Sequence, residues 1–185
     1  RPAEVAAALL RLKKEGKVRW FGVSNLNAEQ MRMYGQHFDV HCLQPSYSLL
    51  NREIEKNELP YCLTKKIGVI TYSSLYRGLL TGKYERTHTF TDSRQNNPLF
   101  TGKGFQCIMD ALDELRPIAE SYGLSLAQLA VRWILTHPAV TSAIVGVKEP
   151  DHIETIVAAA DDILPIAEWH RVAETIQAAR EKALT

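Results

Sequence analysis

The chain has 185 residues, of which 45% are hydrophobic and 23% charged, so it can bury a substantial core and fits neither the disordered nor the collagenous classes. Its 22 lysines and arginines nearly balance 21 acidic residues, and no basic block argues for nucleic acid as a partner. We expect no membrane span and no signal peptide, because no run approaches the roughly 20 apolar residues a span needs. Three widely separated cysteines, Cys42, Cys62 and Cys107, favour reduced thiols and a cytoplasmic location.

The first part of the chain predicts a helix, a strand and a second helix. Apolar residues recur with a helical period over 4–15, and Gly16 is placed to end that helix. The nearly continuous apolar run 18–23 then predicts a strand buried on both faces, a habit of parallel strands covered by helices. Asn27 is placed to cap a helix over 28–36.

The next part repeats the alternation and then changes character. Residues 40–48 predict a second strand, and Asn51 is placed to cap a third helix that runs to about residue 66. The β-branched and aromatic run 69–72 predicts a third strand. Residues 76–104 show neither period, so they predict a long loop, which in a compact domain is usually functional or disordered.

The last part predicts four helices and one more strand. Two helices are expected over about 106–122, ended by Gly123, and 125–136, capped by Ser125. Residues 140–147 predict a fourth strand, and Glu149-Pro150 opens another helix. The closing helix carries a stripe of apolar side chains that predicts core packing: Ile166, Trp169, Val172, Ile176 and Ala179.

Strands that alternate with helices imply right-handed crossovers and a parallel sheet. Four strands are half the number in a (β/α)8 barrel, so the pattern allows either half of such a barrel or a small open sheet. Ligands in both architectures sit at the carboxyl ends of the strands, which makes Ser24-Asn25 a candidate contact point.

Five stretches, in order, resemble the C-terminal half of an aldo-keto reductase, in the bacterial branch related to the potassium-channel β subunits. They are LKKEGKVRWFGVSN (12–25), QPSYSLLNRE (44–53), VITYSSLYRGLLTGKY (69–84), DSRQNNPLF (92–100) and PAVTSAIVGVKEPDHIE (138–154). The resemblance implies a single domain over 1–185 that is the second half of a (β/α)8 barrel, with its strands as the fifth to eighth. It also implies NADPH-dependent reduction of aldehydes or ketones, with this chain supplying the cofactor-binding half.

The resemblance assigns each candidate site residue a part of the cofactor. Ser24, Asn25 and Gln44 match the groups that hydrogen-bond the nicotinamide carboxamide, and Tyr72 matches the aromatic ring that stacks on the nicotinamide. The pyrophosphate loop is matched by Ser73, Leu75, Arg77 and Gly78, and the basic residues of the flap over the cofactor by Lys83 and Arg94. The 2′-phosphate site is matched by Gly146, Lys148 and His152.

The chain also departs from the family pattern. Thr155 and Ile156 stand where the family commonly has Glu-Asn to hold adenine, and His152 stands where Gln or Arg is frequent, so the phosphate preference could depend on pH. The family's catalytic Asp, Tyr, Lys and His would precede Arg1, so no catalytic residue is assigned, and no histidine spacing suggests a metal. We therefore expect no turnover by these residues alone.

Each residue taken singly has a simpler interpretation. Ser24 and Asn25 could merely cap the next helix, Tyr72 could belong to the core, and isolated lysines and arginines are usually solvated. Two other functions also stay open. One is a non-catalytic, nucleotide-sensing regulatory subunit like the channel β subunits. The other is self-association of half barrels through their open strand edges. The carbonyl substrate cannot be inferred.

Overall fold

The structure is a computed structural model that describes residues 2–185, and its centre is a four-stranded parallel sheet in the order β1-β2-β3-β4. The strands are β1 (Gly22–Ser24), β2 (Cys42–Gln44), β3 (Gly68–Thr71) and β4 (Ser142–Ala143). The α-helices are α1 (Pro2–Lys14), α2 (Ala28–Gly35), α3 (Glu58–Lys65), α4 (Gly102–Ser121), α5 (Leu126–Thr136), α6 (Pro150–Val157) and α7 (Ile166–Leu184). The alternation predicted from the sequence is therefore confirmed.

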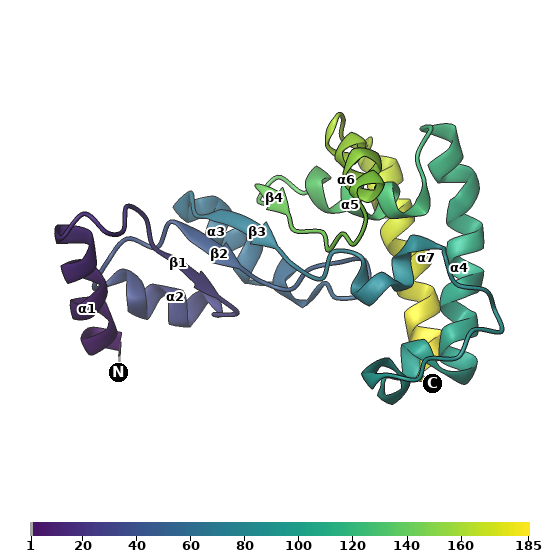
Figure 1. The fold of residues 1–185 in the computed structure, drawn as a ribbon, viewed down its shortest axis with the longest axis horizontal. Helices are drawn as coiled ribbons and strands as arrows, with labels where there is room; N and C mark the ends of the chain where they lie inside the picture. Colours follow the sequence, from purple (N-terminus) through teal and green to yellow (C-terminus); the bar gives the residue numbers. More distant parts are fainter. Residues whose placement is uncertain (1) are drawn as a thin grey trace.

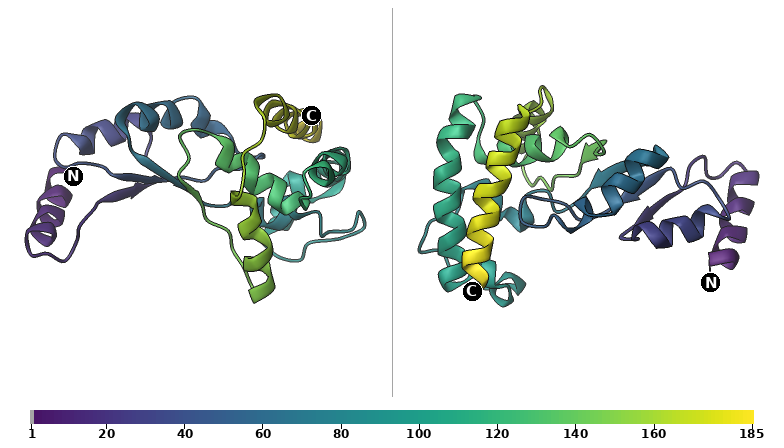
Figure 2. Two further views of the ribbon diagram at one scale, coloured as in Figure 1. Left: turned by 90° about the horizontal axis from the view of Figure 1, so that it is seen from above. Right: turned by 180° about the vertical axis from the view of Figure 1, so that it is seen from behind.

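The molecule is elongated, with α1 at one end and the long helices α4 and α7 side by side at the other (Figure 1). Seen from above, the strands form an open arc with α2 and α3 on one side (Figure 2). Leu43, Val69 and Thr71 are fully buried, whereas their neighbours Cys42 and Ile70 keep some exposure. Half of a (β/α)8 barrel has this form, with one face covered by helices and the other open.

Three of the four strands, β1, β2 and β4, are shorter than the sequence predicts, whereas β3 has the expected length and begins one residue earlier. The backbone ladder does continue beyond β4, since the amide of Thr141 donates to Val69 and that of Ile144 donates to Thr71. After Ile144 the chain leaves the sheet and turns along the cavity described below. An apolar run therefore overestimates strand length, because residues that cover a cavity are as apolar as residues in a sheet.

The prediction that Asn51 caps a helix is wrong. Asn51 instead exchanges two backbone hydrogen bonds with Ser48, and a short 3₁₀ turn over Glu53–Glu55 separates it from α3. The helix itself starts after Asn57, whose side chain makes no capping bond. Two other caps are confirmed: Asn27 and Ser125 both form capping boxes, each with a glutamine three residues on.

The prediction of an irregular loop over 76–104 is also wrong in part. Three 3₁₀ segments occupy it, η2 (Tyr76–Thr81), η3 (Ser93–Asn96) and η4 (Pro98–Phe100), and α4 already begins at Gly102. Such short turns have no extended period to read. Gly104 lies in the first turn of α4, which packs directly on the backbone of Pro98. A Cβ at Gly104 would lie 2.0 Å from the carbonyl oxygen of Pro98, so this position needs a glycine.

The main core lies between α4, α5 and α7 and continues to the buried residues Leu43 and Val69 of the sheet. In α7 the predicted stripe is confirmed for Trp169, Val172, Ile176 and Ala179, which are buried. Ile166 is the exception, 68% exposed, because it is the first residue of the helix and lies beyond the core. Among residues 2–185, no helix is both long enough and apolar enough to span a bilayer.

Candidate dinucleotide-binding site

The carboxyl ends of the parallel strands bring two groups of the candidate residues to one edge of the sheet. Ser24 and Gln44 end β1 and β2 and are directly paired in the register. Tyr72 and Ser73 follow β3, whose end lies next to the end of β4. Ser24 and Ser73, which are 49 positions apart in the chain, therefore reach the same edge, as expected for this fold class.

Ser24, Asn25, Gln44 and Tyr72 form a connected group of hydrogen bonds. The Ser24 hydroxyl donates to the carbonyl oxygen of Gln44 at 2.9 Å, and the backbone N–H of Asn25 donates to the same oxygen at 3.2 Å. The Tyr72 hydroxyl donates to Asn25 Oδ1 at 3.1 Å. Ser24 is thereby left as an acceptor, whereas the Asn25 amide group can donate, a combination that suits a ligand carboxamide.

A cavity of about 550 Å³ opens beside this group, between the end of β3, the flap and the start of α6. We use "flap" for residues 82–97. Of the candidate residues, Ser73, Leu75, Arg77, Gly78, Lys83, Arg94, Gly146, Lys148 and His152 line the cavity. The other four make the hydrogen-bonded group that adjoins it through Tyr72-Ser73. The structure thus brings all thirteen candidates into two neighbouring sets.

The backbone at this edge is unusually constrained. Of the non-glycine residues with positive φ in the described chain, Asn25, Ser73, Tyr76 and Arg77 lie at or just after strand ends, and only Lys66, which ends α3, does not. Such conformations cost roughly 1 kcal/mol or more each and cluster where a ligand demands them. The run from Ser73 to Gly78 turns the chain tightly along the wall of the cavity, a shape known to cradle phosphates.

The cationic side chains around the cavity are not equivalent. Arg94 is held by Asp92, with its Nη2 2.7 Å from Oδ2, and this ion pair lowers the pKa of the Asp92 carboxyl to about 2. Its Nη1 donates to the Tyr84 hydroxyl at 2.6 Å. Arg77 donates to the Ser93 hydroxyl at 2.6 Å. Most of the hydrogen-bonding capacity of Arg94 is therefore spent within the flap.

Several cavity residues were missed by sequence reasoning. Ser74 is buried and its hydroxyl donates to the carbonyl of Ile144, so it joins the ends of β3 and β4 beneath the cavity. Tyr84 places its ring beside Lys83 and Arg94. The other lining residues that the sequence did not single out are Thr81, Ala127, Ile144, Val145 and Val147, whereas Thr155 and Ile156 had been placed at the adenine position by the resemblance. Of these residues, only Tyr84 could have been recognised from the sequence, because it is an aromatic residue next to a lysine in a polar loop. Small and apolar residues occur equally in cavity walls and in cores, so their presence in the sequence does not indicate a cavity.

The described residues contain no cluster of three histidine, cysteine or acidic side chains that could hold a metal ion. The three cysteines do not pair with one another. Burial raises the pKa of the Cys62 thiol to about 11, which makes it a core residue and not a nucleophile. The chemistry on offer is therefore that of hydroxyls, amides, backbone N–H groups and cations around a cavity, which suits a ligand with phosphates and a carboxamide.

Comparison with known proteins identifies the family of the chain. The sequence profile of the "Aldo/keto reductase family" matches residues 2–177. Aldo-keto reductase YhdN of Bacillus subtilis is 39% identical over 156 residues, 83% of this chain and 47% of that protein. The NADH-specific methylglyoxal reductase of Escherichia coli is 34% identical, over 85% and 48% of the two chains.

Two further matches are a channel subunit and a dehydrogenase of known structure. A probable voltage-gated potassium channel β subunit of rice is 36% identical over 66% of this chain and 39% of its own. The structure of a glycerol dehydrogenase from Gluconobacter oxydans superposes with a TM-score of 0.89 at 35% identity, over 97% of this chain and 55% of that one. The chain spans about half the length of the relatives it matches.

Proposed function

Because the chain belongs to the aldo/keto reductase family, we propose that it is the dinucleotide-binding half of a carbonyl reductase. The observation that carries the proposal is the single cavity lined by nine of the candidate residues, next to the hydrogen-bonded group of Ser24, Asn25, Gln44 and Tyr72. A nicotinamide dinucleotide has a carboxamide at one end and phosphates along its length. The two sets offer partners for both, in the right order along the sheet edge.

When bound, the dinucleotide supplies the hydride that reduces an aldehyde or ketone. The residues of this chain position it. Ser24 and Asn25 would hold the carboxamide, Tyr72 would cover one face of the nicotinamide ring, and the turn from Ser73 to Gly78 would meet the pyrophosphate. The strands assigned here are the fifth to eighth of the barrel, and the proton donor for the carbonyl would come from the other half.

We propose NADPH over NADH as the preferred form. Lys148 precedes α6, and His152 lies one turn into it, so a phosphate at this end of the cavity would meet a lysine, an imidazole and the N-terminus of a helix. One relative is NADH-specific by name, so the preference is a property of these particular residues and not of the family. Thr155 and Ile156 line the same end, where adenine would contact a hydroxyl and an apolar side chain.

Isothermal titration of the chain with NADPH and with NADH tests the proposal. We expect binding of both, tighter for NADPH, with the difference reduced in Lys148→Ala but not in Lys103→Ala, a lysine on α4 that does not line the cavity. A phosphate contact of this kind is worth about tenfold in affinity. Absence of heat with either dinucleotide from a folded sample would refute the proposal.

The regulatory alternative rests on the similarity to the rice channel subunit and on no feature of the cavity, so we favour the reductase.

For either function, the uncovered face and the outer edges of β1 and β4 need a partner. We propose that another half barrel covers them, since unpaired strand edges invite pairing. It would come either from a further part of the same protein or from a second copy of this chain. Sedimentation of the chain would distinguish a dimer from a monomer. The cytoplasm remains the expected compartment for its reduced thiols.

A further inference from the structure

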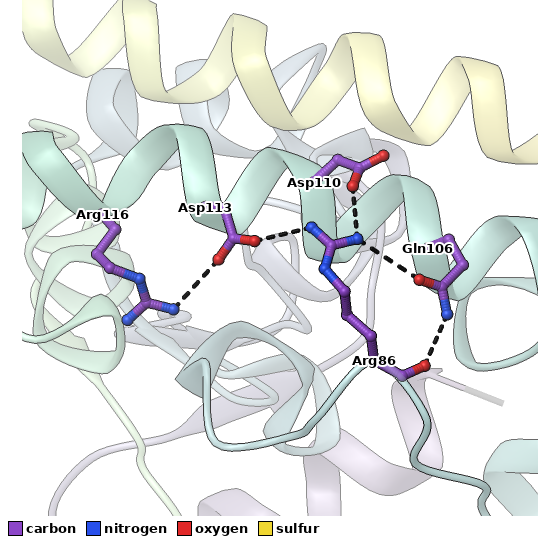
Figure 3. A network of polar contacts seen from close by, with 5 residues as sticks. All are labelled: Arg86, Gln106, Asp110, Asp113 and Arg116. Carbon is purple, nitrogen blue, oxygen red and sulfur yellow. Dashed lines mark hydrogen bonds and ion pairs between the residues drawn. The ribbon is translucent and has the colours of Figure 1, made fainter.

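One arginine attaches the flap to the side of α4, outside the cavity (Figure 3). The guanidinium of Arg86 reaches two carboxylates one turn apart on that helix, with Nη1 2.6 Å from Asp110 Oδ1 and Nη2 2.8 Å from Asp113 Oδ2. Gln106 adds a bond in the other direction, because its Nε2 donates to the carbonyl oxygen of Arg86 at 2.7 Å. We call these four residues the clasp.

The clasp engages both the side chain and the backbone of Arg86. Three atoms of Arg86 take part. Its Nη1 donates to Asp110 and, at 3.5 Å, more weakly to Gln106 Oε1; its Nη2 donates to Asp113, and its carbonyl oxygen accepts from Gln106. The Arg86 guanidinium lowers the pKa of the Asp113 carboxyl, and Arg116, which also reaches Asp113, contributes less. Arg86 is the member of this network that comes from the flap.

A second attachment of the flap is apolar and lies deeper. The Phe90 ring is 6% exposed and packs edge-on against Phe100 and, on α4, Phe105. The Arg86 side chain, by contrast, is 46% exposed. Salt and water reach an exposed ion pair and weaken it, whereas they leave a buried aromatic contact intact. The clasp is therefore the attachment that can open while Phe90 stays in place.

The position of the clasp connects it to the cavity. Lys83 and Tyr84 line the cavity and stand two and three residues before Arg86, in a stretch that begins at Gly82 with a positive φ. Between Gly82 and Phe90, the clasp is the contact that ties this stretch to α4. Tyr84 is also held by Arg94, which donates to its hydroxyl at 2.6 Å, and by its packing against Phe90. Release of Arg86 would therefore loosen the stretch around Lys83 and let that lysine move away from the cavity, while Tyr84 stays in place.

We infer that Arg86 is a positioning residue that latches the flap shut on α4, and that opening of this ionic latch limits the rate at which a bound dinucleotide leaves. The second part rests on the proposed function, whereas the first concerns the protein alone. The latch acts through Lys83 on the flap side of the cavity, and the opposite wall, which includes Gly146 and Lys148, is unchanged when it opens.

Limited digestion with trypsin tests the latch without any ligand. Trypsin must take the Arg86 side chain into its own pocket, so cleavage after Arg86 reports its release from the two carboxylates. We expect Asp110→Asn/Asp113→Asn to be cleaved there about three- to tenfold faster than the wild type, from the usual strength of two exposed ion pairs. Glu114→Gln/Glu120→Gln removes the same charge from α4 outside the clasp and should match the wild type. Equal cleavage of all three proteins would overturn the latch.

Stopped-flow dissociation of NADPH tests the consequence. Arg86→Ala should raise the off-rate about three- to tenfold with little change in the on-rate, and Arg116→Ala, which also removes a guanidinium from Asp113, should not. Added NaCl should speed release from both proteins by screening the phosphate contacts, and more steeply from the wild type, in which it also screens the latch. An off-rate unchanged in Arg86→Ala would overturn the role in release. Failure of every protein to bind NADPH would refute the proposed function instead, and the trypsin result would still decide whether the latch exists.

Discussion

The Tyr72 hydroxyl donates a hydrogen bond to Asn25 Oδ1, 3.1 Å away, and so joins the ends of β1 and β3 across 47 positions of sequence. Asn25 needs this partner for two reasons. Its φ of 55° is unusual for a residue with a side chain, and its amide can present its donor group to a ligand only if the oxygen is occupied elsewhere. Tyr72 therefore orients Asn25 in addition to offering its own ring.

Tyr72→Phe separates these two roles, because it keeps the ring and removes the hydroxyl. We expect dinucleotide affinity to fall about fivefold, the value of one hydrogen bond of about 1 kcal/mol. Tyr72→Ala should fall further because the ring is lost as well. Tyr122→Phe, on an exposed residue at the end of α4, is the control. Equal affinity of Tyr72→Phe and wild type would show that Asn25 is held without Tyr72.

Gly104→Ala should destabilise the fold by about 1–3 kcal/mol, because the added Cβ would overlap the carbonyl oxygen of Pro98 and neither backbone can yield freely. Gly35→Ala is the matched control: it lies in α2, has no atom within 4 Å of the added Cβ, and should be neutral or slightly stabilising. Urea unfolding followed by circular dichroism measures both. A neutral Gly104→Ala would mean that α4 and the turn before it are not packed as described.

The two tryptophans of the core should matter far more than the exposed one. Trp133 and Trp169 stack in parallel with centroids 5.2 Å apart, and each indole N–H donates to the backbone carbonyl of the other residue at 2.9 Å. Trp169→Phe loses one of these bonds, leaves a buried carbonyl unpaired and should cost about 2–4 kcal/mol. Trp20→Phe, at a side chain 68% exposed, should cost less than about 0.5 kcal/mol in the same unfolding experiment.

Acidification should weaken the fold in part through His137. Burial lowers the pKa of this imidazole, and its Nδ1 accepts a hydrogen bond from the amide of Ala139, which only the neutral ring can do. The unfolded chain therefore binds a proton more readily than the folded chain. The contribution of the neutral His137 ring to the free energy of unfolding is present in full above pH 6.5, the ordinary pKa of histidine. It is lost as the pH falls through that value toward the lower pKa of the folded state.

His137→Asn keeps an acceptor at this position and cannot take up the proton. Between pH 7.5 and 5 its free energy of unfolding should fall less steeply than that of the wild type. His170→Asn, at an exposed residue on α7, should keep the wild-type slope. If the free energy of unfolding depended on pH identically in all three proteins, protonation of His137 would not contribute to the loss of stability in acid.

The sequence predicted the order of strands and helices well because buried apolar runs and caps are local features. Asn27, Ser125 and the stripe of α7 illustrate this. The failures were at Asn51, whose partner Ser48 was not foreseen, and at Gly104, a helical residue whose lack of a side chain is required by the close approach of Pro98. Both depend on tertiary contacts that no local pattern contains.

The same distinction between local patterns and tertiary contacts applies to the candidate site. Ser24, Tyr72 and Lys148 were proposed through a resemblance between whole motifs; in the structure the first two lie at the edge of the sheet and Lys148 lines the neighbouring cavity. Which cations are free could not be predicted. That Arg94 spends its donors on Asp92 and Tyr84, and that Arg86 reaches α4, depend on how residues 82–97 fold back on the chain.

The central claim is the location of the dinucleotide, and hydrogen exchange of the chain with and without NADPH tests it most directly. The account predicts slower exchange in two separate segments, 72–84 and 144–156, which line the two sides of the cavity. The groove between residues 49–56 and α7, a second hollow of about 350 Å³, should be unaffected. Protection confined to that groove, with the two cavity segments unchanged, would contradict the account.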